Sequence, residues 1–155
     1  MIQAKENFLK HAYIPLLKKL QPGQVAKWGK MDSQQMVEHM RDACKLANGK
    51  LVFPLLNSDP EKLSKARAFM MSEELFKENT KVAIMPDEPR PHKFDSLSEA
   101  IHQLEPELNL LFVVFAADPL KTLVNPVFGE LNYEEQICLL YKHAKHHLRQ
   151  FGLVE

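Results

Sequence analysis

The chain has 155 residues, of which 45% are hydrophobic and 26% are charged, a composition typical of one globular domain and unlike that of a disordered chain. Twenty basic and twenty acidic side chains give a formal net charge of zero, which disfavours nucleic acid and anionic membranes as partners. No apolar run is long enough to cross a bilayer, and the charged start of the chain is unlike a signal peptide. We therefore expect one cytoplasmic domain over 1–155.

The first predicted element is an amphipathic helix over residues 8–20, where apolar side chains recur at helical spacing. Pro15 lies inside it and lacks a backbone N–H, so we expect a kink there or a helix that starts again nearby. The sequence Gln21-Pro22-Gly23 ends the helix.

A second helix is predicted between Asp32 and Asn48. Asp32 and Gln35 have the spacing of a capping box, and Asn48-Gly49 is a typical helix end. From residue 50 to 94 the pattern is poorer and is broken by five prolines, and only Glu61 to Phe76 is periodic enough to predict a shorter helix. This stretch is therefore expected to be a long connection.

Two more helices are predicted in the second half of the chain. Ser96 and Asn132 each precede an apolar stripe and each have a glutamate three residues later, the capping-box spacing. Pro106 should bend the third helix, and residues 118–131 should form a loop. Four amphipathic helices without an alternating strand pattern predict an all-α fold, an up-down four-helix bundle with a long irregular connection between helices two and three.

The seven histidines are the only clustered chemistry in the sequence, and three of them lie on the last helix. At about 100° per residue, His147 lies about 70° from the centre of the apolar stripe, His143 about 110°, and His146 nearly opposite. His146 is therefore expected to be exposed, whereas His143 and His147 share one face. On the second helix, His39 lies about 90° from the centre of the stripe, at the edge of the buried face.

These positions allow His39, His143 and His147 to bind one divalent cation. Imidazole suits zinc, nickel, copper and iron, and three protein ligands with a free fourth position are typical of a catalytic site. A His-x-x-x-His pair is also common as an ordinary boundary pair, so spacing alone leaves both interpretations open. The remaining histidines are expected in solvent: His11, His92 and His102.

Three other metal or redox motifs are disfavoured. Cys44 and Cys138 are not spaced as CxxC, and the simplest interpretation is two buried, reduced thiols. A di-iron carboxylate bundle needs two Glu-x-x-His pairs, and the predicted bundle offers only Glu99 with His102. Ala144 occupies the place of the catalytic glutamate in a His-Glu-x-x-His metalloprotease motif. The predicted site thus has no carboxylate base beside His143.

Several stretches taken together resemble an uncharacterised branch of the DinB/YfiT-like superfamily. The resemblance runs from about Asn7 to Gly152, and its most specific part is the ending His-His-Leu-Arg-Gln-Phe-Gly. The stretches that carry it are Trp28-Gly29-Lys30-Met31, Gln35-Met36-Val37-Glu38-His39, Asn125-Pro126-Val127-Phe128-Gly129-Glu130-Leu131 and the segment from Tyr141 to Gly152.

The resemblance implies a four-helix bundle whose metal is held by one histidine of the second helix and two of the last. These positions are His39, His143 and His147, and zinc or nickel is the expected metal. Similar sequences often have histidine at the start of the Pro-Phe-Phe-Gly-like loop, where this chain has Asn125. If that residue binds substrate or a water molecule behind the metal ligands, this chain is expected to differ there.

Characterised members of the superfamily include metal-dependent transferases and isomerases that use low-molecular-weight thiols, so the resemblance implies a thiol-dependent S-transferase. A metal-dependent hydrolase and a non-catalytic metal-binding or ligand-binding module are the alternatives. Asn125, Tyr141 and Gln150 are candidate substrate contacts, although Tyr141 can equally pack in the core. Small bundles often pair, and we expect a homodimer.

Overall fold

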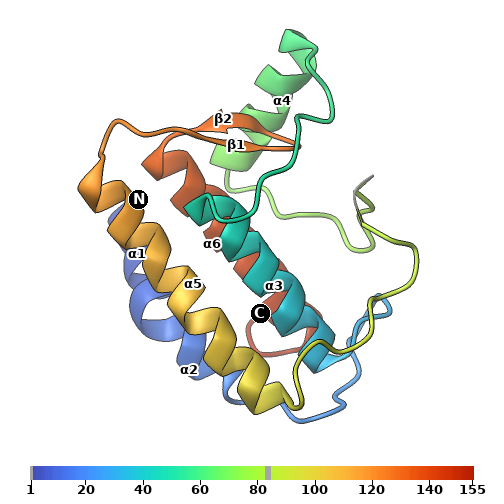
Figure 1. The fold of residues 1–155 in the computed structure, drawn as a ribbon. Helices are drawn as coiled ribbons and strands as arrows, with labels where there is room; N and C mark the ends of the chain where they lie inside the picture. Colours follow the sequence, from blue (N-terminus) through green and yellow to red (C-terminus); the bar gives the residue numbers. More distant parts are fainter. Residues whose placement is uncertain (1, 83–84) are drawn as a thin grey trace.

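The computed structural model describes residues 2–82 and 85–155 and is mostly helical, with one small antiparallel hairpin. Figure 1 shows the longer helices lying side by side, with α4 (Pro60–Met71) and the hairpin together at one end. The predicted helical fold is confirmed, but the chain is not purely α-helical. Within the described ranges, no helix has both the length and the apolar character needed to cross a membrane.

The N-terminal helix begins earlier than predicted and is irregular before Pro15. It consists of α1 (Ile2–Asn7), a π-helical turn η1 (Phe8–Ala12) and α2 (Tyr13–Leu17). The Tyr13 N–H donates to the Phe8 carbonyl, five residues back, as in a π-helix. Because Pro15 has no N–H to give to the preceding turn, the break falls just before it, as expected for a proline kink.

The second predicted helix is confirmed as α3 (Ser33–Asn48). The Asp32 carboxylate accepts a hydrogen bond from the Gln35 N–H at 2.8 Å, and the Gln35 side chain accepts one from the Asp32 N–H at 3.0 Å. This reciprocal capping box satisfies two donors that a helix start would otherwise leave free. Gly49 follows with a φ of 87°, the left-handed conformation that ends many helices.

The connection after α3 differs from the prediction in one respect, because α4 ends at Met71 rather than at Phe76. The Ser72 N–H still donates to the carbonyls of Ala68 and Phe69, and its hydroxyl accepts from the Glu74 N–H, which turns the chain away. Phe76 therefore lies in extended chain, free to reach another part of the molecule. The long irregular connection is confirmed for the described residues.

The second half of the chain contains α5 (Leu97–Ala117), the strands β1 (Leu123–Asn125) and β2 (Gly129–Leu131), and α6 (Tyr133–Gln150). Asn132 forms the predicted capping box with Glu135. Ser96 forms only half of one: its hydroxyl accepts a hydrogen bond from the Glu99 N–H, but the Glu99 carboxylate accepts from the Gln103 side chain and not from the backbone of Ser96. Pro106 lies inside α5. The hairpin replaces the predicted loop, because strands of three residues are too short to show an alternating pattern.

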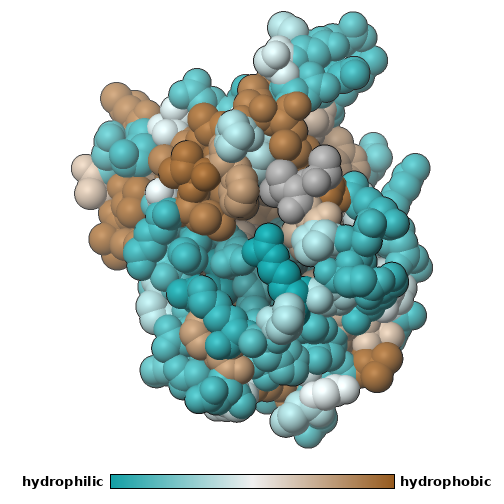
Figure 2. Space-filling view, turned by 45° about the vertical axis from the view of Figure 1, so that its right-hand side comes forward, coloured by the Kyte–Doolittle hydropathy of each residue, from teal (hydrophilic) through white to brown (hydrophobic). Residues whose placement is uncertain are grey.

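One hydrophobic core joins the N-terminal helix to α3, α5 and α6. Among its fully buried members are Leu9, Tyr13, Leu17, Met36, Met40, Leu104, Leu111, Ile137 and Leu148. Each large apolar side chain buried there contributes about 1.5–3 kcal/mol. Cys44 belongs to this core, and both cysteines are buried and free, as predicted. Figure 2 shows the outside, with apolar side chains gathered on the upper half of one face above a mostly hydrophilic lower half.

Candidate metal centre

The structure brings together the three histidines that the sequence selects. His39 comes from α3, and His143 and His147 come one turn apart from α6, where the two helices face each other. The Nε2 atom of His143 lies 3.0 Å from the Nε2 atoms of both His39 and His147. One ligand atom from each side chain lies within 4.8 Å of the others.

This arrangement fits a divalent cation. Zinc held by imidazoles at about 2.0–2.1 Å in tetrahedral geometry separates neighbouring nitrogens by about 3.3 Å, close to the spacing already present. Burial lowers the pKa of His39 to about 4. Burial and the two neighbouring imidazoles lower the pKa of His143 well below 6.5, and burial with His39 does the same for His147. All three rings are therefore neutral at pH 7, the form that binds metal.

Gln150, a candidate substrate contact from the sequence, lies against His147 instead of in the open. Its side chain is 4% exposed, and its Oε1 atom is 2.7 Å from His147 Nδ1. Its amide NH₂ donates to the Trp28 carbonyl at 2.9 Å. A His-x-x-Gln spacing on one helix was the sequence signal for this contact, because side chains three residues apart meet on a helix surface.

His146 is not exposed as the helical wheel predicts. Its ring is half-buried, with the rings of Trp28 and Phe76 at centroid distances of 5.7 and 5.8 Å. Phe76 also approaches the His143 ring, at 6.2 Å. The helical wheel predicts that the face of α6 opposite the apolar stripe is exposed to solvent. In the structure, Trp28 from the loop before α3 and Phe76 from the connection after α4 cover that face. Sequence periodicity within one helix cannot reveal such a cover.

Lys142 is a buried neighbour of the histidines that the sequence analysis did not single out. Only 7% of it is exposed, and its ammonium donates to the backbone carbonyls of Phe69 at 2.7 Å and Ser72 at 2.9 Å, and also to that of Glu74. Burial lowers the pKa of Lys142. These bonds fasten the end of α4 to α6 and so hold the start of the connection, with Phe76, beside the histidines.

The other two candidate substrate contacts have neighbours of their own. The Asn125 side chain accepts hydrogen bonds from the N–H groups of Val127 and Phe128, at 2.9 and 3.1 Å, and so shapes the hairpin turn. Tyr141 is half-buried and packs edge-on against Phe8 at 5.2 Å. Over the described residues, neither has a hydrogen bond or ring contact with the three histidines. His11, His92 and His102 are exposed, as predicted.

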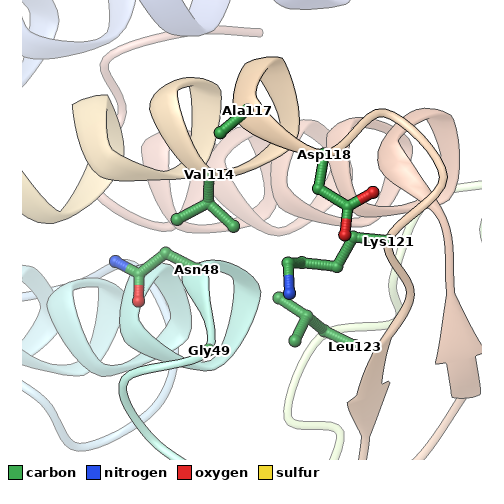
Figure 3. Close-up of a pocket in the computed structure, with 7 residues that line it drawn as sticks. All are labelled: Asn48, Gly49, Val114, Ala117, Asp118, Lys121 and Leu123. Atoms are coloured by element: carbon green, nitrogen blue, oxygen red, sulfur yellow. The ribbon is translucent and has the colours of Figure 1, made fainter.

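A hollow of about 420 Å³ lies at another place, between the ends of α3 and α5 and the hairpin. Figure 3 shows Asn48, Val114 and Leu123 around it, with Lys121 at one side. The Asn48 amide already donates to Glu107. This hollow includes none of the predicted site residues.

Comparison with known proteins adds no relative: no family model, no curated protein and no solved structure matches the chain.

Proposed function

We propose that the chain is a metal-dependent enzyme of the DinB-like type, with an up-down four-helix bundle in which His39, His143 and His147 hold zinc or nickel. The observation that carries the proposal is the convergence of three neutral Nε2 atoms from two helices, with two of the three distances at 3.0 Å. A boundary pair of histidines has no reason to meet a third imidazole from another helix.

The expected reaction is transfer of a low-molecular-weight thiol to an electrophile. A divalent cation at such a site would supply a Lewis acid that lowers the pKa of a bound thiol, so that its proton passes to water and the thiolate is a strong nucleophile at neutral pH. In the transfer, sulfur would form a bond to the electrophilic atom as that atom's leaving group departs. His39, His143 and His147 would hold that cation. The cation-capable group contains imidazoles alone, without a carboxylate to act as base, and thiol activation needs no such base.

The surroundings of the histidines suit a small substrate. His39 and His143 are only half-buried, so the group retains access from outside. The aromatic ring of Phe76 lies beside His143, with the ring centroids 6.2 Å apart, and gives the surroundings an apolar side.

The metal is tested first, by adding zinc or nickel to the purified apo-protein and measuring metal content after gel filtration. We expect close to one ion per chain in the wild type and almost none in the variant His39→Ala. His102→Ala, which removes an exposed histidine, is the matched control and should retain the ion. A wild-type protein that stays metal-free with zinc, nickel and manganese would refute the proposed site.

The reaction is tested on the loaded protein with glutathione or bacillithiol and a set of electrophiles, by following thiol loss. Consumption that exceeds the apo-protein control supports the transferase. Hydrolysis of ester or amide substrates without thiol loss identifies the hydrolase instead. A metal that raises stability without any turnover identifies a binding module.

We also propose a homodimer with a small-molecule substrate and neither nucleic acid nor membrane as partner. Large apolar side chains remain exposed, among them Leu120 at 93% and Val52 at 79%, and burial of such surface favours self-association. Sedimentation equilibrium should give a mass twice that of the chain. A monomer at all concentrations tested would refute the dimer and leave the metal site untouched.

A further inference from the structure

Gln150 connects the candidate metal ligand His147 to the loop that precedes α3. One end of its amide lies 2.7 Å from His147 Nδ1, and the other donates to the Trp28 carbonyl at 2.9 Å. Both Gln150 and His147 are about 95% buried, with exposed fractions of 4% and 5%. The amide therefore cannot form hydrogen bonds with solvent in another orientation, and His147 and the Trp28 carbonyl determine how it is oriented.

The hydrogen-bonding types of these groups assign the proton on His147. A carbonyl oxygen only accepts, so the NH₂ end of Gln150 must face Trp28 and its Oε1 must face His147. That oxygen also only accepts, so Nδ1 of His147 must carry the hydrogen. A neutral imidazole has one N–H, and the lone pair therefore lies on Nε2. Nε2 is the atom that meets His143 at 3.0 Å.

The loop is shaped to allow this contact. Gly29 has a φ of +78°, and a Cβ atom built there would lie 2.8 Å from Gln150 Nε2, closer than carbon atoms approach nitrogen without a shift. The Lys27 N–H donates to the Gln150 carbonyl at 2.8 Å, and the Gln24 amide donates to the Phe151 carbonyl at 3.1 Å. The loop is thus fastened to the end of α6 at two points just before Trp28.

We infer that Gln150 is a positioning residue, which together with the Trp28 carbonyl holds His147 as the Nδ1–H tautomer and directs its Nε2 lone pair toward the metal position. This inference rests on the proposed function and deepens it, because it assigns Gln150 to the support of a ligand and not to substrate. Partners of this kind orient ligating histidines, and their loss typically weakens metal binding about 10- to 100-fold.

The tautomer is tested first, on the metal-free protein, by long-range ¹H–¹⁵N correlation of the histidine side chains at pH 7.5. We expect His147 in the wild type to be protonated at Nδ1 only. Gln150→Met has a similar length but removes both hydrogen bonds, and should show Nε2–H as well. Gln150→Glu keeps an acceptor for Nδ1–H and should retain the wild-type tautomer. Wild-type protonation at Nε2, or no change in the methionine variant, would overturn the inference.

Metal binding is tested second, by competition of the protein with a chromophoric zinc chelator. We expect Gln150→Met to bind zinc about 10- to 100-fold more weakly than the wild type, with its helix content unchanged by circular dichroism. Should this variant fail to fold, the glutamate variant and the glycine variants below still decide the question.

Two glycines provide a matched pair of variants. Gly29→Ala places a methyl group against the Gln150 amide and should weaken zinc binding. Gly23→Ala imposes the same kind of backbone strain, at a φ of +70°, but its Cβ meets nothing within 4 Å, so zinc affinity should be unchanged. Equal zinc affinity in the two variants would overturn the role of the Gly29–Gln150 contact.

These outcomes separate the inference from the proposed function. If the wild type binds no metal, the proposed site fails, while the tautomer measured on the apo-protein still tests the Trp28–Gln150–His147 connection. If the wild type binds zinc and Gln150→Met binds it equally well, the site stands and only the role of Gln150 is refuted.

Discussion

Polar side chains gather at two places along α3, and the two groups are built differently. Near the end of the helix, the Glu107 cluster consists of the Glu107 carboxylate with Asn48, Lys50 and Arg41. The carboxylate accepts from Asn48 and from Lys50, each at 3.0 Å, and Arg41 lies 3.9 Å away. Nearer its start, His39 meets His143 and His147.

In the Glu107 cluster the charged carboxylate has its counter-ions and hydrogen-bond donors within the chain, so the cluster is complete. The histidine group contains three acceptor nitrogens and no acidic partner, so it is incomplete. Burial alone would raise the pKa of Glu107, but hydrogen bonds from Lys50 and Asn48 and the charges of Lys50 and Arg41 outweigh it and lower that pKa. In the histidine group, burial acts against protonation of every ring, and three nitrogens converge without an acid among them. A complete cluster stabilises the fold, and an incomplete one is suited to an external cation.

The largest expected effect is the loss of zinc binding when a member of the histidine group is removed. His147→Ala should lower zinc affinity by about a thousandfold or more, equivalent to about 4 kcal/mol, because two imidazoles no longer enclose the ion. Isothermal titration calorimetry measures this change. Zinc at about 100 times its dissociation constant should raise the wild-type free energy of unfolding by about 2.7 kcal/mol and leave the variant unaffected.

His146→Ala is the matched control for that measurement. His146 is adjacent to His147 and half-buried, but it lies outside the three-histidine group. The variant should therefore retain zinc binding even if it loses some stability through its contacts with Trp28 and Phe76. Equal loss of zinc in both variants would show that the geometry does not select the ligands.

The next effect is a loss of stability of the apo-protein in mild acid. Because burial lowers the pKa of His39 from 6.5 to about 4, the unfolded state takes up a proton in this interval and the folded state does not. The free energy of unfolding must then fall as pH falls, by about 1.4 kcal/mol per pH unit, or about 3 kcal/mol for His39 alone. Urea unfolding between pH 6.5 and 4 measures it. A His39→Asn variant should show a shallower slope, and an unchanged slope would contradict the assignment.

Glu107→Gln is expected to have a smaller effect and a different pH dependence. Removing the charge leaves Lys50 and Arg41 without their counter-ion and should cost about 1–2 kcal/mol at pH 7. Because the folded pKa is lowered, this contribution is present above the unfolded value of 4.5 and disappears as pH falls below it. Denaturant unfolding compares the two proteins. The exposed pair of Glu61 with Lys65 supplies the control, since Glu61→Gln should change stability by less than about 0.5 kcal/mol.

The difference between the two clusters also explains what the sequence can reveal. The histidine group was predictable only in part: helical periodicity places His143 and His147 on one face, and capping at Asp32 and Asn132 fixes where α3 and α6 begin. Spacing alone left an ordinary boundary pair open, and the choice of His39 as the third ligand rested also on the family resemblance. The Glu107 cluster was not predictable, since its members come from two helices and a turn with no spacing in common.

Cover from distant segments is the other feature that local patterns miss. Phe76 and Trp28 bury His146, although both lie far from it in the chain. The length of α4 was overestimated for a related reason, because Lys142 of α6 satisfies the carbonyls at its end. Such contacts depend on tertiary packing, which periodicity within one segment does not encode.

The smallest expected effect concerns a third kind of buried polar group, one with no partner. Tyr13 is fully buried, and within residues 2–82 and 85–155 its hydroxyl has no hydrogen-bond partner. A buried hydroxyl without a partner costs free energy, so Tyr13→Phe should raise the free energy of unfolding by up to about 1 kcal/mol while the ring continues to fill the core. Thermal unfolding compares it with Tyr141→Phe, a half-buried control that should be nearly neutral. A loss of stability in Tyr13→Phe would mean that the hydroxyl does have a partner in the folded protein, and this part of the core would then resemble the complete Glu107 cluster.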